Sequence, residues 1–173
     1  MAETLEALLN AVDRADSAAA LVGAVRALAA AGSEAAIPKL IEVLGYNNPG
    51  AAVAAVEGLV ALGSVAVTPI LNTLDGYDYG ARAWANRALA KIGDPRALDN
   101  LLAAAQGDFA LSVRRAAAQG LGHLHWAQLS ASEQATGQHQ ALAALVQASQ
   151  DGEWVVRYAA IAGLEGLAQA APP

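Results

Sequence analysis

The sequence predicts an all-α fold built from about five helical hairpin repeats. About a quarter of the residues are alanine, the strongest helix former, and β-branched residues are sparse. A two-residue signature, Gly or Ala followed by Leu, recurs along the chain within an apolar stripe that has helical spacing. Self-similarity at a period of about 30 residues is typical of stacked repeats, which bury their apolar faces against one another.

The signature marks the repeats. Its copies follow one another at steps of 31, 30, 32 and 43 residues, and they are Ala27-Leu28, Gly58-Leu59, Ala88-Leu89, Gly120-Leu121 and Gly163-Leu164. Five residues after the first three copies come Gly32-Ser33, Gly63-Ser64 and Gly93-Asp94. A glycine in the left-handed conformation ends one helix, and a Ser or Asp side chain caps the next. Pro95 then suits a first helical position, where its missing N–H is not needed.

Each repeat is predicted to hold a shorter first helix and a longer second helix. The first helices are expected near Ile37–Leu44, Val67–Leu74, Arg96–Ala105 and His139–Ser149. The second helices carry the stripes Ala51/Ala55/Leu59/Leu62, Ala81/Ala85/Leu89/Ile92, Val113/Ala117/Leu121/Leu124 and Val156/Ala160/Leu164/Leu167, and a degenerate first copy uses Ala20/Ala24/Leu28/Ala31. One hairpin cannot bury such a stripe alone, so we expect a single HEAT-like α-solenoid domain over residues 1–173.

The 43-residue step contains an insertion, HLHWAQLSASEQATGQH, from His123 to His139. The glycine and the cap of the other joints are absent there, so we expect an irregular loop. The chain ends in AQAAPP without a polar capping helix. An open end of a repeat stack invites a partner or a further segment.

Composition disfavours several classes of function. The net charge of −6 disfavours nucleic acid as a partner, and the lack of cysteine excludes disulfides, thiolate nucleophiles and cysteine metal sites. The histidines, His123, His125 and His139, have no carboxylate close in sequence, so no metal site is expected. A glycine and a proline break the uncharged stretch Gly58–Leu74, and no basic leader precedes it, so we expect a soluble cytoplasmic protein without a membrane partner.

The few aromatic residues gather near arginines. The chain has eight aromatic side chains, and Tyr77, Tyr79 and Trp84 lie within eight residues of one another, beside Arg82 and Arg87. In three repeats an arginine six residues before the signature follows an aspartate in the preceding turn: Asp78 and Arg82, Asp108 and Arg114, Asp151 and Arg157. These columns flank the buried stripe, and we favour a ladder of ion pairs between neighbouring repeats.

A second set of columns points away from the stripe. Nine and five residues before the signature stand Tyr79 and Ala83, Leu111 and Arg115, and Trp154 and Tyr158, while Trp84 and Arg87 lie toward the same exposed side. Such a surface suits a flat, conjugated, anionic ligand, with rings stacking and arginines binding carboxylates. It equally suits a protein-binding groove, because Trp, Tyr and Arg dominate interface hot spots. At the corresponding turn of the second repeat, helix capping is the favoured role of Tyr46, Asn47 and Asn48.

Four stretches resemble one family. SEAAIPKLIEVLGYNNPGAAVAAVEGL, YGARAWANRALAKIGDPRAL, DFALSVRRAAAQGLG and DGEWVVRYAAIAGLE are similar to the F-type subunit of the heterodimeric E/F phycocyanin α-subunit phycocyanobilin lyases, and together they span Ser33 to Glu165. The resemblance implies a cyanobacterial protein that acts only with an E-type partner. Together the two subunits would attach phycocyanobilin, through a thioether bond, to a cysteine of the phycocyanin α-subunit. The related isomerising lyases carry a Cys/His motif in this subunit, so the lack of cysteine implies simple addition.

The resemblance also suggests roles for the surface residues. In this hypothesis arginines hold the bilin propionates, aromatic rings restrict its conformation, and a carboxylic acid protonates it; no cofactor is bound permanently, since the bilin is a substrate. The bilin-binding residues are Tyr79, Trp84, Arg87, Arg115, Trp154 and Tyr158, and the acid is Asp78, with Asp108 and Asp151 as weaker candidates. An alternative is a non-enzymatic adaptor that binds phycobiliproteins during assembly or degradation.

Overall fold

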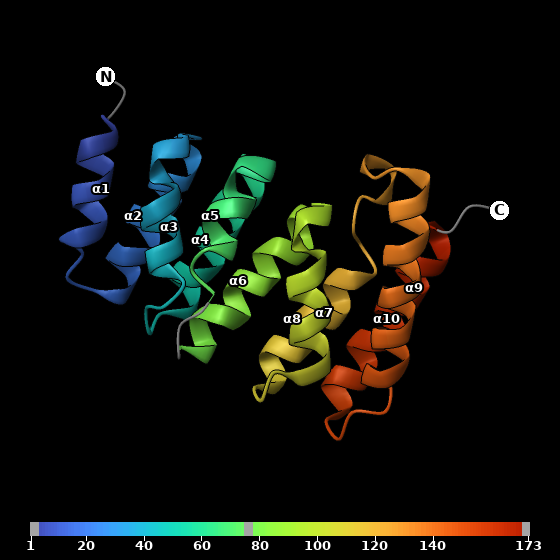
Figure 1. The fold of residues 1–173 in the computed structure, drawn as a ribbon. Helices are drawn as coiled ribbons and strands as arrows, with labels where there is room; N and C mark the ends of the chain where they lie inside the picture. The colour runs from blue at the N-terminus through green and yellow to red at the C-terminus, as the bar shows by residue number, and fades with distance from the viewer. Residues whose placement is uncertain (1–3, 75–77, 171–173) are drawn as a thin grey trace. The chain divides into compact units, whose positions relative to one another are not determined.

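A computed structural model describes residues 4–74 and 78–170 (Figure 1), so Tyr77 lies outside the described residues. Within these ranges the ordered elements are all helical. The first helices of the five hairpins are α1 (Leu5–Asp13), α3 (Ile37–Val43), α5 (Val67–Leu71), α7 (Leu98–Gly107) and α9 (Ala131–Ala148). The second helices are α2 (Ala18–Ala30), α4 (Pro49–Leu62), α6 (Tyr79–Ile92), α8 (Leu111–Leu121) and α10 (Trp154–Ala170). Short 3-10 helices are η1 (Glu34–Ala36), η2 (Gly63–Ala66), η3 (Pro95–Ala97) and η4 (Trp126–Gln128).

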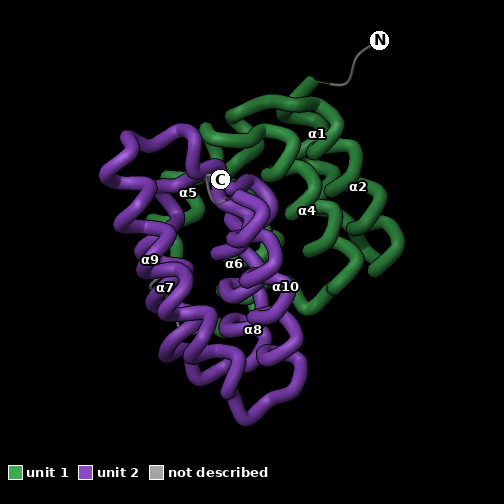
Figure 2. The backbone as a smooth tube through the Cα atoms, turned by 90° about the vertical axis from the view of Figure 1, so that its right-hand side faces the viewer, with its two compact units in different colours: residues 1–88 green, residues 89–173 purple. Residues whose placement is uncertain are grey.

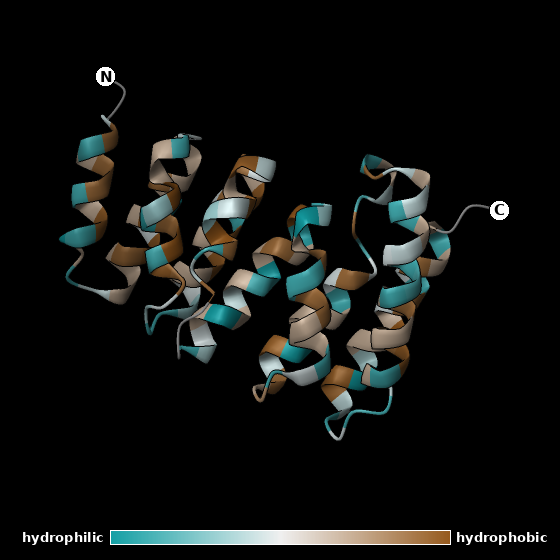
Figure 3. Cartoon of the chain, viewed as in Figure 1, coloured by the Kyte–Doolittle hydropathy of each residue, from teal (hydrophilic) through white to brown (hydrophobic). Residues whose placement is uncertain are grey.

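The chain forms two compact units, residues 1–88 and 89–173 (Figure 2). In the first unit α2 packs against α1 and α4, and α3 packs against α4 and α5. In the second unit α8 packs against α7 and α10, and α9 packs against α7 and α10. Bands of hydrophobic and hydrophilic residues alternate along α1 (Figure 3), as expected of a helix with one buried and one solvated face. The predicted helical hairpins are therefore confirmed.

The predicted helix ends are confirmed at three joints. Gly32, Gly63 and Gly93 have φ values of 60°, 70° and 70°, in the left-handed region where glycine avoids the steric cost of a side chain. The carboxylate of Asp94 accepts a hydrogen bond from the backbone N–H of Arg96 at 3.0 Å, as a cap should. At Ser33, by contrast, the side chain makes no capping hydrogen bond.

The glycines of the repeat signature lie where two second helices approach closely. A Cβ atom on Gly58 would lie 2.7 Å from the Cβ of Ala29, and one on Gly120 would lie 2.7 Å from the Cβ of Ala90. Gly163 approaches Ala118 in the same way, because its Cβ would lie 2.5 Å from the Ala118 carbonyl oxygen. A small residue at this position lets α4 pack against α2, α8 against the end of α6, and α10 against α8.

The insertion differs from its prediction. An irregular loop was expected from His123 to His139, but α9 already begins at Ala131, and only residues 122–130 connect it to α8. Ser130 caps α9, since its Oγ accepts the backbone N–H of Glu133 while the Glu133 carboxylate accepts the N–H of Ser130. Trp126 is only 2% exposed, and its indole lies close to Gly137 of α9. The extra residues therefore lengthen a helix and add to the core.

Residues 49–71 form the one described segment that is long and apolar enough to cross a membrane, with a mean hydropathy of 1.9. Half of that window is buried inside the protein. The segment is also not one continuous α-helix, because α4 ends at Leu62 and the positive φ of Gly63 follows. The buried side of α4 packs against α2 and α3, which accounts for its apolar composition.

Candidate functional site

One rung of the predicted ladder is a bidentate ion pair. Nε and Nη2 of Arg114 on α8 donate to the two carboxylate oxygens of Asp151 at 2.7 and 3.1 Å. Both side chains are largely buried, with 17% and 13% of their surface exposed. The hydrogen bonds from Arg114 hold the pKa of Asp151 below its ordinary value. This pair links α8 to the turn before α10, so the structural interpretation is confirmed there.

The ladder arginines also brace their own turns, which the sequence did not indicate. Nη1 of Arg114 donates to the carbonyl oxygens of Asp108 and Phe109 at 2.8 and 3.0 Å. Nη1 of Arg157 donates in the same register, to the carbonyl oxygens of Asp151 and Gly152 at 2.9 and 3.0 Å. In each of these two repeats, one arginine of the second helix thus holds the loop that joins the two helices of its own hairpin.

The three aspartates considered as acids all accept backbone hydrogen bonds at turns. Oδ1 of Asp78 accepts from the N–H of Ala81 at 3.0 Å, at the start of α6. Oδ1 of Asp108 accepts from the N–H of Ala110 at 2.8 Å, and Oδ1 of Asp151 accepts from the N–H of Glu153 at 2.9 Å. Asp78 stands apart because it is exposed, whereas Asp108 and Asp151 are partly buried.

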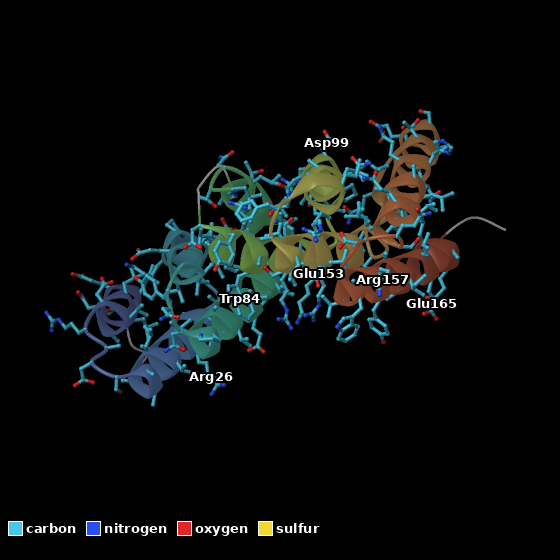
Figure 4. The ribbon with its side chains drawn as sticks, turned by 90° about the horizontal axis from the view of Figure 1, so that it is seen from below. Arg26, Trp84, Asp99, Glu153, Arg157 and Glu165 are labelled. Atoms are coloured by element: carbon cyan, nitrogen blue, oxygen red, sulfur yellow. The ribbon has the colours of Figure 1, made fainter. Side chains whose placement is uncertain are left out.

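On the first unit, α6 presents a stacked cation and ring. The guanidinium carbon of Arg87 lies 5.3 Å from the centroid of the Trp84 ring, within the range of a cation–π contact. Arg87 is exposed and Trp84 is partly exposed (Trp84 is labelled in Figure 4). Tyr79, at the start of the same helix, is 57% exposed. An aromatic ring and a positive charge are therefore exposed side by side on one helix.

On the second unit, Trp154 and Tyr158 lie four residues apart on α10 and are 67% and 73% exposed. Residues with this spacing share one face of a helix. Arg115 is exposed on α8, which packs against α10. The six predicted bilin-binding residues thus fall into two surface groups by unit: Tyr79, Trp84 and Arg87 on the first, and Arg115, Trp154 and Tyr158 on the second.

Among the large apolar residues that are more than half exposed, two were not identified from the sequence, Phe109 and Ile161. Ile161 is 58% exposed and stands two residues before its signature. In the four preceding repeats the equivalent residues are at most 2% exposed, and they are Val25, Val56, Asn86 and Ala118. These four positions are each followed by a further second helix, whereas Ile161 stands in the last copy of the signature, and this difference was the sequence signal for its exposure.

Other polar residues have structural roles. Oδ1 of Asn48 accepts from the N–H of Ala51 at 3.0 Å at the start of α4, which confirms the capping interpretation. The Tyr46 hydroxyl donates to the carboxylate of Glu42. His123 hydrogen-bonds through Nδ1 to the carbonyl oxygen of Gln119 at 2.8 Å. Across the described residues, no three His, Asp or Glu side chains gather as metal ligands would.

Known proteins resemble this chain over nearly its whole length. A family model described as HEAT repeats matches residues 5–85 and 69–165. The chain is 62% identical to the phycocyanin alpha phycocyanobilin lyase CpcF of Synechocystis sp., over 96% of this chain and 78% of that protein. It is 56% identical to the phycocyanobilin lyase subunit beta of Nostoc sp., over 92% of this chain and 80% of that protein.

A solved structure agrees with these relatives. In the complex of CpcE and CpcF of phycocyanin lyase from Nostoc sp. PCC7120, one chain superimposes with a TM-score of 0.77 at 56% identity, over 80% of this chain and 82% of that chain. The fold class and the resemblance inferred from the sequence are thereby confirmed. The chain is a HEAT-repeat protein and belongs to the family of F-type phycocyanobilin lyase subunits.

Proposed function

We propose that the chain is one subunit of a heterodimeric bilin lyase, which attaches phycocyanobilin by a thioether bond to a cysteine of the phycocyanin α-subunit. The observation that carries this proposal is the 62% identity, over 96% of the chain, to a phycocyanin alpha phycocyanobilin lyase. A relative of known structure occurs in a complex with CpcE, which supports an E-type subunit as the partner. The same names favour the lyase over a non-enzymatic adaptor.

The two surface groups are our candidates for contact with the bilin. Phycocyanobilin is a conjugated tetrapyrrole with two propionate groups, so it needs flat apolar contacts and cations. On α6, the ring of Trp84 offers stacking and Arg87, 5.3 Å from its centroid, offers a charge for a propionate. On the second unit, Trp154 and Tyr158 supply rings and Arg115 supplies the charge.

The reaction requires a thiol, which the substrate protein supplies, since this chain has no cysteine. The thiolate sulfur forms a bond to the ethylidene carbon, the carbon–carbon double bond opens, and a proton is delivered to the bilin. Asp78 is our candidate for the acid when this subunit provides one, because its exposed carboxyl lies one residue before Tyr79. The remaining rate enhancement over the uncatalysed addition comes from holding the bilin and the thiol in a reactive orientation.

We further propose that the bilin is bound only as a substrate and that the protein works in the cytoplasm without contact to nucleic acid or membranes. The acidic net charge of −6 supports the absence of a nucleic-acid partner. Cysteine-free F-type subunits should add the bilin without isomerising it, so the product should carry unmodified phycocyanobilin.

The test is co-expression of this chain with an E-type subunit, a phycocyanin α-subunit and the enzymes that make phycocyanobilin. Covalent bilin fluorescence is then read on a denaturing gel, and the absorption spectrum reports isomerisation. Pigment on the α-subunit only when both lyase chains are present supports the proposal. Stable binding of the α-subunit without pigment would favour the adaptor instead.

A further inference from the structure

Exposed apolar side chains concentrate on the last hairpin. In the described part of the chain ten large hydrophobic residues are exposed, and five of them belong to α9 or α10: Leu142, Val146, Trp154, Tyr158 and Ile161. Residues 134–150 also contain no Asp, Glu, Lys or Arg. Apolar enrichment together with loss of charge is typical of the core of a protein interface rather than of a solvated surface.

One stripe on α10 combines these apolar residues with two opposite charges. The α10 stripe consists of Trp154, Arg157, Ile161, Glu165 and Ala168, all of which are exposed. At about 100° per residue, the other four members lie within about 40° of Ile161 around the helix. Arg157 and Glu165 can both be followed along α10 in Figure 4.

In preceding repeats, the position equivalent to Ile161 is covered by the second helix of the next repeat, whereas the α10 stripe has no such cover in the described chain. The equivalent of Ile161 on α8 is Ala118, which is fully buried, and α10 packs against α8. Gly163 of α10 approaches the Ala118 carbonyl closely at this point. After α10 the described chain provides no further helix, so Ile161 remains 58% exposed.

The members of the α10 stripe are spaced symmetrically about Ile161, and opposite charges stand at equal distances on either side of it. Arg157 precedes Ile161 by four residues and Glu165 follows it by four, while Trp154 and Ala168 lie seven residues to either side. If two such helices run antiparallel about a two-fold axis at Ile161, residues equally distant from it face each other. Each Arg157 then meets a Glu165, and each large indole meets a small alanine.

We propose that α10 is a self-association surface, on which a second copy of this chain docks antiparallel through the α10 stripe. A two-fold interface must be self-complementary, and this stripe is so in charge and in side-chain size. A contact of one helix pair is below the usual size of stable interfaces, so we expect a reversible dimer with a dissociation constant on the order of 10 µM.

The dimer would have a consequence for the proposed function. It covers Trp154 and brings Tyr158 to its edge, so self-association and ligand contact at this face exclude each other. The partner-free subunit would thereby cover Trp154 and Ile161, two of its exposed apolar residues. Dimerisation of the isolated chain does not require lyase activity, so it can be tested separately from the proposed function.

The experiment is sedimentation velocity on the isolated full chain, from about 1 to 200 µM, a range that brackets the expected constant. Wild-type protein should change from monomer to dimer across this range. Ile161→Glu, Arg157→Glu and Glu165→Arg should each weaken dimerisation by about tenfold or more, because each places like charges or a buried carboxylate at the contact. Glu57→Arg on α4 is the matched control, an exposed charge reversal outside the stripe that should leave the dimer unchanged.

An equimolar mixture of Arg157→Glu and Glu165→Arg gives the decisive result. In the antiparallel pair each variant supplies the charge that the other lacks, so the mixture should recover dimer that neither variant forms alone. A misfolded variant could not be rescued in this way, and circular dichroism checks the fold of each. A monomeric wild-type protein, or a mixture as monomeric as its components, would overturn the proposal.

Discussion

The close approach at Gly120 gives the most direct test of the packing. A Cβ atom on Gly120 would lie 2.7 Å from the Cβ of Ala90 and 3.0 Å from its Cα. The nearest obstacles are thus a short side chain and the backbone of α6, which cannot rotate away. Gly120→Ala must therefore push α8 away from Ala90, in the last turn of α6, which belongs to the second unit.

Two opposing terms determine the size of the effect. Alanine is favoured over glycine inside a helix by about 0.8–1 kcal/mol. Overpacking a tight contact costs about 1–3 kcal/mol, and a separation of 2.7 Å to a rigid neighbour belongs in the upper part of that range. The net expectation is a loss of about 1–2 kcal/mol in the free energy of unfolding, or a fall in Tm of about 2–8 °C for a chain of this size.

Gly23 on α2 provides the matched control, because a Cβ atom there would meet nothing within 4 Å. Gly23→Ala should raise stability by about 0.5–1 kcal/mol, since the helix preference then acts without a clash. Urea unfolding followed by circular dichroism measures both variants. A Gly120→Ala protein as stable as Gly23→Ala would refute the argument that the glycine is needed for the helix contact.

Three further outcomes are expected. Asp151→Asn should destabilise the protein by about 1–3 kcal/mol at pH 7, because Arg114 loses a bidentate partner in a largely buried site. The Asp151 pKa is lowered in the folded state, so the stability it confers is present at neutral pH and is lost as the pH falls through that folded value; a urea series across acidic pH should show a shallower loss for Asp151→Asn. Trp84→Leu should reduce the rate of bilin attachment by about 2- to 30-fold, the kinetic equivalent of a cation–π contact of about 0.5–2 kcal/mol, whereas Phe109→Leu should leave the rate unchanged. Asp78→Asn should retain its helix cap and hence its stability, since Asn caps as well as Asp, but should slow attachment; an unchanged rate would remove Asp78 from the mechanism.

The sequence predicted the parts of the fold that depend on local chemistry. Gly32, Gly63 and Gly93 could be identified because a left-handed residue between two helices is almost a glycine-specific requirement. Asp94 and Asn48 could be identified as caps because short polar side chains bond their own backbone. These features need only a few neighbouring residues, so a repeat pattern was enough to find them.

The extension of α9 was missed although a local signal was present. Ser130 and Glu133 have the spacing of a capping box, which marks a helix start. The polar composition of the insertion and the absence of the usual glycine outweighed that signal. The burial of Trp126 could not be foreseen, because it depends on a contact with Gly137 made only after α9 has formed.

For the candidate site, the sequence predicted which side chains are exposed better than it predicted which hydrogen bonds they make. The exposure of Trp154 and Tyr158 follows from helical periodicity. The pairing of Arg114 with Asp151, 37 residues away, was expected from the ladder. Its carbonyl contacts in the preceding turn depend on the loop conformation, which no spacing rule specifies.

The glycines of three signatures, Gly58, Gly120 and Gly163, set the distance between two neighbouring second helices, while Leu59 and Leu121, beside the first two, fill the core. In most cores the same side chains both set the distance between helices and fill the space between them. Here adjacent residues perform these two tasks separately. An exchange of Gly and Ala at Gly58 or Gly120 would alter the pitch at one layer of the stack and leave the buried leucines in place. Repeat proteins of this construction can therefore change the curvature of a binding surface one layer at a time, without a new core.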